Sequence, residues 1–167
     1  KIHQLALKYG APTIAVLAGG LDSIYPADHY RLAEQIIESG GLLISEYPPL
    51  CRPRPAKFPI RNRIIAGLSK VTIVLEAAIR SGSLTTAKAA LDYNREVMAV
   101  PSEITRRDAD GTNFLIKQGA TLLDDPAQIY EIYGLKSKKS IETLDAPANE
   151  LLHLLTRESL SVDQIAQ

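Results

Sequence analysis

Short apolar runs alternate with stretches of helical period along most of the chain. The runs are rich in Val, Ile, Leu and Ala and are continuously apolar, which is typical of strands covered on both faces. They predict strands at residues 13–17, 42–45, 71–75 and 97–100, with a weaker one at 121–123. The intervening stretches predict helices at residues 27–39, 59–68, 83–94, 112–118 and 126–133, and residues 1–8 resemble the end of a further helix.

The repeated strand–helix order predicts right-handed crossovers and a mainly parallel sheet between helical layers, which is a Rossmann-like three-layer α/β sandwich. Residues 1–134 therefore read as one domain. The pattern stops at residues 135–147, where lysines stand among serines without an apolar period, so we predict a linker there. Residues 148–167 read as the start of a small helical module.

The composition limits which kinds of protein this can be. An apolar share of 46% excludes disorder of the whole chain, and the 19 basic residues balance the 19 acidic ones. No global field then steers the protein toward nucleic acid, so an anion site has to be local. The single cysteine, Cys51, forms no internal disulfide, and the apolar runs are too short to span a bilayer. These features favour a reducing cytoplasm.

A local cation cluster lies within residues 52–63 and consists of Arg52, Arg54, Lys57, Arg61 and Arg63. The fork of a guanidinium group suits phosphate oxygens, so this segment is a candidate anion site. The alternative is a solvated helix start with ion pairs to nearby carboxylates, and spacing alone leaves both open.

Helical geometry separates two arginines of this cluster. The period places Ile60, Ile64, Gly67 and Leu68 on a buried stripe. Arg61 and Arg63 then project from opposite flanks of the helix, so one of them could instead pair with Glu46 or Glu76.

Two strand-to-helix turns are further candidate anion sites. Residues 76–87 enter a helix through a turn of small residues, where free backbone N–H groups and the hydroxyls of Ser81, Ser83 and Thr85 could cradle an anion. The simpler alternative is that Ser83 only caps the helix. After the first strand, Gly19 and Gly20 permit close approach of a ligand, or form only a turn.

Candidate catalytic groups are few. The histidines are His3, His29 and His153, and no spacing of metal ligands is present, so we expect neither a metal nor a cofactor. Glu46 and Glu76 each follow a strand and could act as acid and base, although pairing with arginine is a simpler role.

Several blocks are similar in order and spacing to those of the DprA/Smf (DNA-processing protein A) family, namely residues 20–22, 25–26, 44–48, 58–69, 81–87 and 111–120. The resemblance extends to Gly134. It implies a Rossmann-like core that binds single-stranded DNA without cutting it, acts as a homodimer, and loads the RecA recombinase onto strands taken up in natural transformation. It also implies a C-terminal winged-helix domain, of which residues 148–167 would be the start.

The resemblance attaches DNA binding to two segments of this chain. The residues concerned are Arg54, Lys57, Arg61, Asn62 and Arg63, then Ser81, Gly82, Ser83, Thr85 and Thr86, with Gly19, Gly20, Glu46 and Glu76 in support. The sequence departs from the family pattern at Ala18, His29 and Ser102. It also lacks the family's N-terminal strand with its Gly-Ser-Arg loop, which helps to form the same pocket.

Two other functions remain open at this level. The chain could be a nucleotide-cleaving enzyme similar to the phosphoribohydrolases, with Glu76 in the catalytic position. It could also be an interaction module whose surface docks only a protein. We expect the non-catalytic DNA-binding function.

Overall fold

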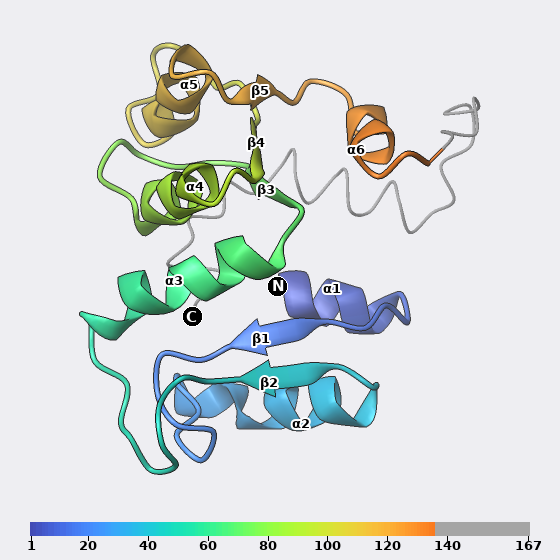
Figure 1. Cartoon of the computed structure of the whole chain (residues 1–167), viewed down its shortest axis with the longest axis vertical. Helices are drawn as coiled ribbons and strands as arrows, with labels where there is room; N and C mark the ends of the chain where they lie inside the picture. Colours follow the sequence, from blue (N-terminus) through green and yellow to red (C-terminus); the bar gives the residue numbers. More distant parts are fainter. Residues whose placement is uncertain (136–167) are drawn as a thin grey trace.

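The computed structural model describes residues 1–135, in which short parallel strands alternate with helices (Figure 1). The elements follow in the order α1 (Ile2–Lys8), β1 (Ile14–Val16), η1 (Ala27–His29), α2 (Tyr30–Glu38), β2 (Leu42–Ile44), α3 (Lys57–Leu68), β3 (Val71–Val74), α4 (Gly82–Asp92), β4 (Glu96–Ala99), α5 (Asp110–Lys117), β5 (Thr121–Leu122) and α6 (Ala127–Ile132). Every element expected within these residues is present, with ends that agree to about two residues. The expected linker, apart from its first residue, and the C-terminal module lie outside the described residues and stay predictions.

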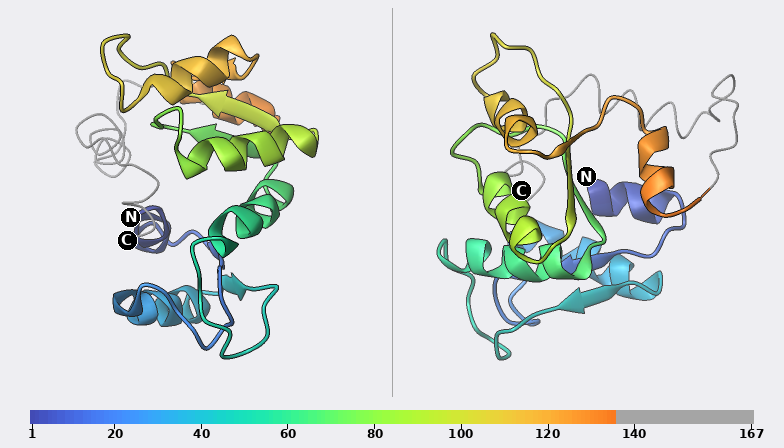
Figure 2. Two further views of the ribbon diagram at one scale, coloured as in Figure 1. Left: turned by 90° about the vertical axis from the view of Figure 1, so that its left-hand side faces the viewer. Right: turned by 45° about the horizontal axis from the view of Figure 1, so that its top comes forward.

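The Rossmann-like α/β prediction is confirmed, because every strand pair in residues 1–135 is parallel. The strands nevertheless form two sheets and not one: β1 pairs with β2, and β3 pairs with β4 and then β5. Helix α3 lies between the two sheets in all views (Figures 1 and 2). Within residues 1–135, no hydrogen-bonded ladder joins β1 to β3.

The first sheet is less covered than the sequence indicated. Helix α2 packs on it through the buried Ala33 and Ile36, and Val16 is buried at the end of β1. However, the register partners Ile14 and Leu42 are 48% and 56% exposed. Our expectation that all strands are covered on both faces is therefore wrong for β1 and β2 within the described residues.

The main core lies where α3, α4 and α5 meet the second sheet. Ala66 on α3 and Ala87 and Ala90 on α4 are fully buried, so the two helix backbones come close together. Val74 and Ala99 contribute from the strands below them.

This packing corrects the predicted face of α3. The buried positions are Asn62 and Ala66, whereas Ile60 and Leu68 of the predicted stripe are 49% and 58% exposed. Apolar residues occur on several sides of this helix, so the period did not identify one face. The small Ala66 decides the orientation because it fits against the alanines of α4.

Candidate nucleic-acid interface

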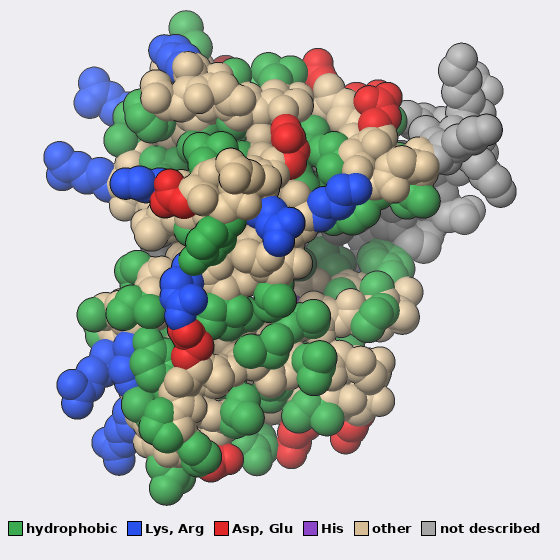
Figure 3. Space-filling view, in the orientation of Figure 1, with side chains coloured by type: hydrophobic (Ala, Val, Ile, Leu, Met, Phe, Trp, Pro, Cys, Tyr) green, Lys and Arg blue, Asp and Glu red, His purple; other side chains and the backbone are tan. Residues whose placement is uncertain are grey.

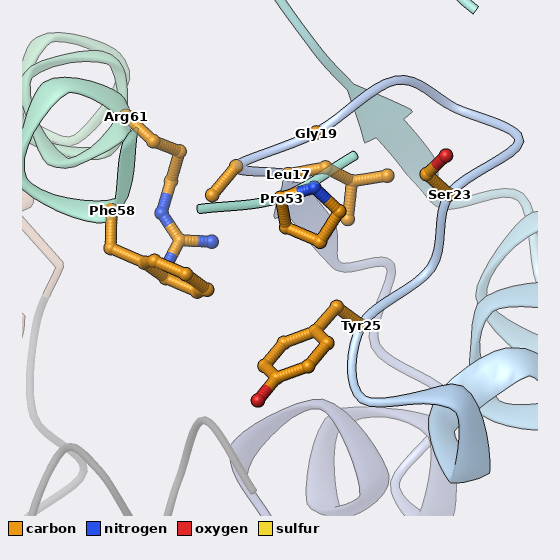
Figure 4. A pocket seen from close by; sticks show the side chains of 8 residues that line it. Leu17, Gly19, Ser23, Tyr25, Pro53, Phe58 and Arg61 are labelled. Carbon is orange, nitrogen blue, oxygen red and sulfur yellow. The ribbon is translucent and has the colours of Figure 1, made fainter. Parts of the chain in front are cut away.

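A small cavity opens at the carboxyl end of β1, which is the edge where parallel sheets bind ligands. It is lined by parts of three segments, the loop after β1, the loop after β2 and the first turns of α3 (Figure 4): Leu17, Ala18, Gly19, Ser23, Tyr25, Pro53, Phe58 and Arg61. Its volume of about 30 Å³ has room for roughly two water molecules and not for a nucleobase. It can therefore take an anion's oxygens at its mouth while the rest of a ligand stays outside.

Arg61 is the charged group of this cavity. Its guanidinium donates to the carbonyl oxygen of Val16 through Nη1 and to Oδ1 of Asn62 through Nε, at 3.3 Å for the second contact. Its central carbon lies 5.4 Å from the ring centroid of Phe58. Burial lowers the pKa of Arg61, yet a guanidinium group stays charged at neutral pH. No carboxylate among residues 1–135 pairs with it, and Nη2 is left to bind an anion.

Arg63 has a different environment from Arg61. It forms an ion pair with Glu46, which follows β2, and the two side chains are 47% and 36% exposed. The prediction that one of the two arginines pairs with a glutamate is confirmed. The neighbouring Asn62 is buried and accepts the hydrogen bond from Arg61, so it positions that arginine.

The two other predicted cations of this segment also differ. Lys57 Nζ donates to Cys51 Sγ at 2.8 Å and to the Arg52 carbonyl at 2.7 Å, and it lies 4.5 Å from the ring centroid of Tyr47. Lys57 thus holds its own loop in shape. Arg54 is exposed and has no ion pair within the described part of the chain.

The second predicted segment forms the N-terminus of α4. Ser81 is the N-cap and accepts a hydrogen bond from the Ser83 N–H at 3.2 Å. Our alternative that Ser83 is the cap is wrong, because Ser83 is the second helical residue and is buried. A Cβ at Gly82 would meet nothing within 4 Å, so this helix end is open to a ligand. Thr85 is exposed and Thr86 half-buried on the following turn.

The glycines after β1 serve contacts within the chain. A Cβ on Gly19 would lie 2.8 Å from the carbonyl oxygen of Cys51, and one on Gly20 would overlap the carbonyl oxygen of Pro48. The Gly20 N–H donates to the Cys51 carbonyl at 2.8 Å. The loop after β2 therefore fills the space that the sequence left open for a ligand, and the glycines shape the cavity wall.

Glu46 and Glu76 do not form an acid–base pair. They follow strands of different sheets, and each is bound by an arginine. Arg106 Nη2 lies 2.8 Å from Glu76 Oε1 and 2.8 Å from Asp108 Oδ2. The hydrogen bond to Asp108 and the charge of Glu76 raise the pKa of Arg106, and the same hydrogen bond lowers the pKa of Asp108.

Sequence reasoning missed Tyr25 and Arg106. The Tyr25 ring lines the cavity and packs edge-on to Phe58 at a centroid distance of 6.1 Å, with 63% of the residue exposed. The run Arg106-Arg107-Asp108 just before α5 was the available signal for the ion pair with Glu76. The cavity brings together Gly19 and Arg61, while residues 81–86 lie outside its lining.

Within residues 1–135, no three His, Cys, Asp or Glu side chains are grouped so as to hold a metal ion. Across the same residues, no helix has the length and apolar character needed to cross a membrane.

The family described as "DNA recombination-mediator protein A" matches residues 1–134 of this chain. The chain is 50% identical to protein Smf of Escherichia coli over 129 residues, which is 77% of this chain and 34% of that protein. It is 46% identical to the DNA processing protein DprA of Streptococcus pneumoniae over 121 residues, 72% of this chain and 43% of that protein. The chain thus spans well under half the length of these curated relatives.

Two solved structures are similar to this one. The X-ray structure of DprA from Streptococcus pneumoniae gives a TM-score of 0.69 with 41% sequence identity, covering 77% of this chain and 45% of that chain. The Helicobacter pylori DNA processing protein A, described with its single-stranded DNA binding mode, gives a TM-score of 0.65 with 26% identity. That match covers 78% of this chain and 69% of that chain.

Proposed function

Because the chain belongs to the DNA recombination-mediator protein A family, we propose that the protein binds single-stranded DNA and delivers it for recombination without cutting it. The observation that carries the proposal is Arg61, a charged side chain that lines a cavity at the carboxyl end of β1 and has no carboxylate partner in residues 1–135. A phosphate group supplies the negative charge that this guanidinium lacks. The Helicobacter pylori relative, which is described as binding single-stranded DNA, supports the choice of ligand.

The proposed contacts differ in kind along the site. Arg61 binds a phosphate at the cavity mouth, and Arg54 follows the lining residue Pro53 on the loop after β2. Lys57 and Asn62 hold the loop and the guanidinium in position. A second phosphate binds at the open N-terminus of α4. The residues there are Ser81, Gly82, Ser83, Thr85 and Thr86. Backbone contacts of this type give little base specificity.

The carboxylates support a binding role without catalysis. A phosphoribohydrolase-like enzyme would use Glu76 as its catalytic carboxylate, yet Arg106 binds this side chain at 2.8 Å. Glu46 is similarly engaged by Arg63. The residues that line the cavity include no carboxylate or imidazole to serve as a general base.

The cellular role that we propose for the protein is based on its family. We propose that the protein acts in the cytoplasm as a homodimer during natural transformation and loads RecA onto single strands.

The test is fluorescence anisotropy with single- and double-stranded oligonucleotides over a range of salt concentrations. We expect preference for the single strand and a slope of log K against log[salt] of roughly −0.7 per phosphate neutralised. Arg61→Gln should flatten the slope by about 0.7, whereas Arg31→Gln, an exposed arginine on α2, should leave it unchanged. A salt-independent titration would overturn the proposal. Gel filtration that shows a protein complex but no oligonucleotide complex would favour a pure interaction module.

A further inference from the structure

A thiol and an amine lie in direct contact at the junction of the loop after β2 and α3. Lys57 Nζ is 2.8 Å from Cys51 Sγ, and Cys51 is half-buried. The loop lies at the lower left of Figure 1, and Figure 3 shows Lys and Arg side chains projecting into water at the same place. A small oxidant dissolved in water can therefore reach this sulfur. Cys51 is the single cysteine of the chain, so no disulfide within the chain competes for it.

Further contacts hold the two reactive atoms together. The Cys51 carbonyl accepts a hydrogen bond from the Gly20 N–H at 2.8 Å, which ties the sulfur-bearing residue to the loop after β1. Lys57 Nζ donates to the Arg52 carbonyl at 2.7 Å and lies 4.5 Å from the ring centroid of Tyr47. Because the nitrogen and the sulfur are held side by side, a reaction between them is intramolecular and needs no encounter of separate molecules.

We propose that Cys51 and Lys57 form a reversible sulfenamide crosslink when the protein meets hydrogen peroxide. In the first step the Cys51 thiol reacts with one peroxide molecule and gives a sulfenic acid and water, so the sulfur is oxidised and the peroxide is reduced. In the second step Lys57, after its ammonium has released a proton to water, attacks the sulfur with its nitrogen lone pair. The S–N bond forms, the S–O bond breaks, and the hydroxyl group leaves with a proton from the nitrogen as water.

Thiols reverse the crosslink. A thiolate attacks the sulfur of Cys51, the S–N bond breaks, and the Lys57 amine leaves with a proton from water. The mixed disulfide that remains is reduced by a second thiol, which restores the free cysteine.

The crosslink changes both the charge and the freedom of the loop. It converts the Lys57 ammonium into an uncharged nitrogen, so the cation cluster loses one positive charge. It also closes a covalent ring through residues 51–57, which include Pro53 of the cavity lining. The cavity wall is then fixed for as long as the bond lasts. The reaction needs only the two side chains and peroxide, so it does not depend on the proposed DNA binding.

The test is mass spectrometry of the full chain after treatment with hydrogen peroxide, under non-reducing conditions. We expect a product lighter than the untreated chain by two hydrogen atoms, and dithiothreitol should restore the original mass. Trypsin locates the bond, because Arg52 and Arg54 each precede a proline and resist cleavage, whereas Lys57 does not. A sulfenamide at Lys57 blocks cleavage there, so the peptide that contains Cys51 should extend to Arg61.

Two variants serve as controls. Lys57→Arg keeps the positive charge, but a guanidinium group does not give up its proton and is a poor nucleophile. This variant should gain oxygen at Cys51 and lose no hydrogen. Cys51→Ser should likewise show no loss of hydrogen.

Three outcomes would overturn the proposal. One is a wild-type chain that only gains oxygen while trypsin still cuts after Lys57. Another is a Cys51 thiol that stays free for alkylation after peroxide treatment. The third is loss of two hydrogen atoms in Lys57→Arg, which would place the new bond on a backbone nitrogen.

Discussion

Arg61 on α3 donates a hydrogen bond to the main-chain carbonyl of Val16, the last residue of β1, which lies 45 positions earlier in the chain. This contact joins the basic helix to the strand end where the cavity forms. The residue that we propose for phosphate binding therefore also holds two separate parts of the fold together.

Arg61→Lys should separate charge from geometry. A lysine keeps the positive charge, but its single ammonium cannot reproduce the planar fork that reaches Val16 and Asn62 together. We expect the free energy of unfolding to fall by about 1 kcal/mol in urea titrations. Affinity for single-stranded DNA, measured by anisotropy, should fall roughly fivefold. Arg63→Lys is the matched control and should bind like the wild type, because a lysine can still pair with Glu46. Equal behaviour of the two variants would contradict this role for Arg61.

Glu46→Gln should increase binding of single strands. The substitution releases Arg63 from its ion pair, which adds one available cation beside the cavity. Anisotropy should show affinity about threefold higher and a salt slope steeper by about 0.7. Stability should change by less than about 1 kcal/mol, because both partners of the pair are partly exposed. Glu38→Gln, an exposed glutamate at the end of α2, removes the same charge elsewhere and should not affect binding.

Gly20→Ala should destabilise the protein strongly. The new methyl group would overlap the Pro48 carbonyl oxygen and lie 3.0 Å from the Leu50 nitrogen, and neither is a side-chain atom that can rotate away. We expect a loss of about 2–3 kcal/mol in urea unfolding. Gly82→Ala is the control: its methyl group meets nothing within 4 Å at the start of α4, where alanine favours the helix. A Gly20→Ala variant as stable as Gly82→Ala would show that the loop after β2 does not pack against Gly20.

Stability should depend on pH through His3. Burial, followed by the charges of the amino terminus, Arg61 and His29, lowers the pKa of this imidazole, whose Nδ1 lies 2.8 Å from Thr13 Oγ1. The folded state then binds fewer protons than the unfolded state once the pH falls below about 6.5. The contribution of neutral His3 is therefore present above about pH 6.5 and is lost on acidification through the lowered pKa. Urea unfolding between pH 7.5 and about 5 should show this loss, and His3→Gln should reduce it.

Local sequence patterns predicted the elements well and the faces of the helices less well. The continuous apolar runs located β1 to β5, and the helical stretches between them located the helices. The orientation of α3 was not predictable, because Ile60 and Leu68 are as apolar as Ala66. Only the close contact with the alanines of α4 selects Ala66 as the buried residue.

For the candidate site, too, the sequence predicted the segments but not the contacts between them. The sequence located the cation cluster, the small-residue turn at 81–86 and the pairing of one arginine with Glu46 or Glu76. It did not indicate that Lys57 folds back on Cys51, that Ser81 and not Ser83 is the cap, or that Tyr25 lines the cavity. These depend on how loops from different strands meet.

By itself, the sequence determined the order of strands and helices, the parallel pairing that this order requires, and the family, because these depend on local periodicity and on residues close together in the chain. The tertiary structure decided which cationic side chains remain free of a carboxylate partner and can bind an anion. Arg61 and Arg63 are two positions apart, yet one lines a cavity and the other is neutralised by Glu46, since the partner of each is brought in from a distant segment. Electrostatic free energy depends on distances in space, and sequence spacing does not provide those distances.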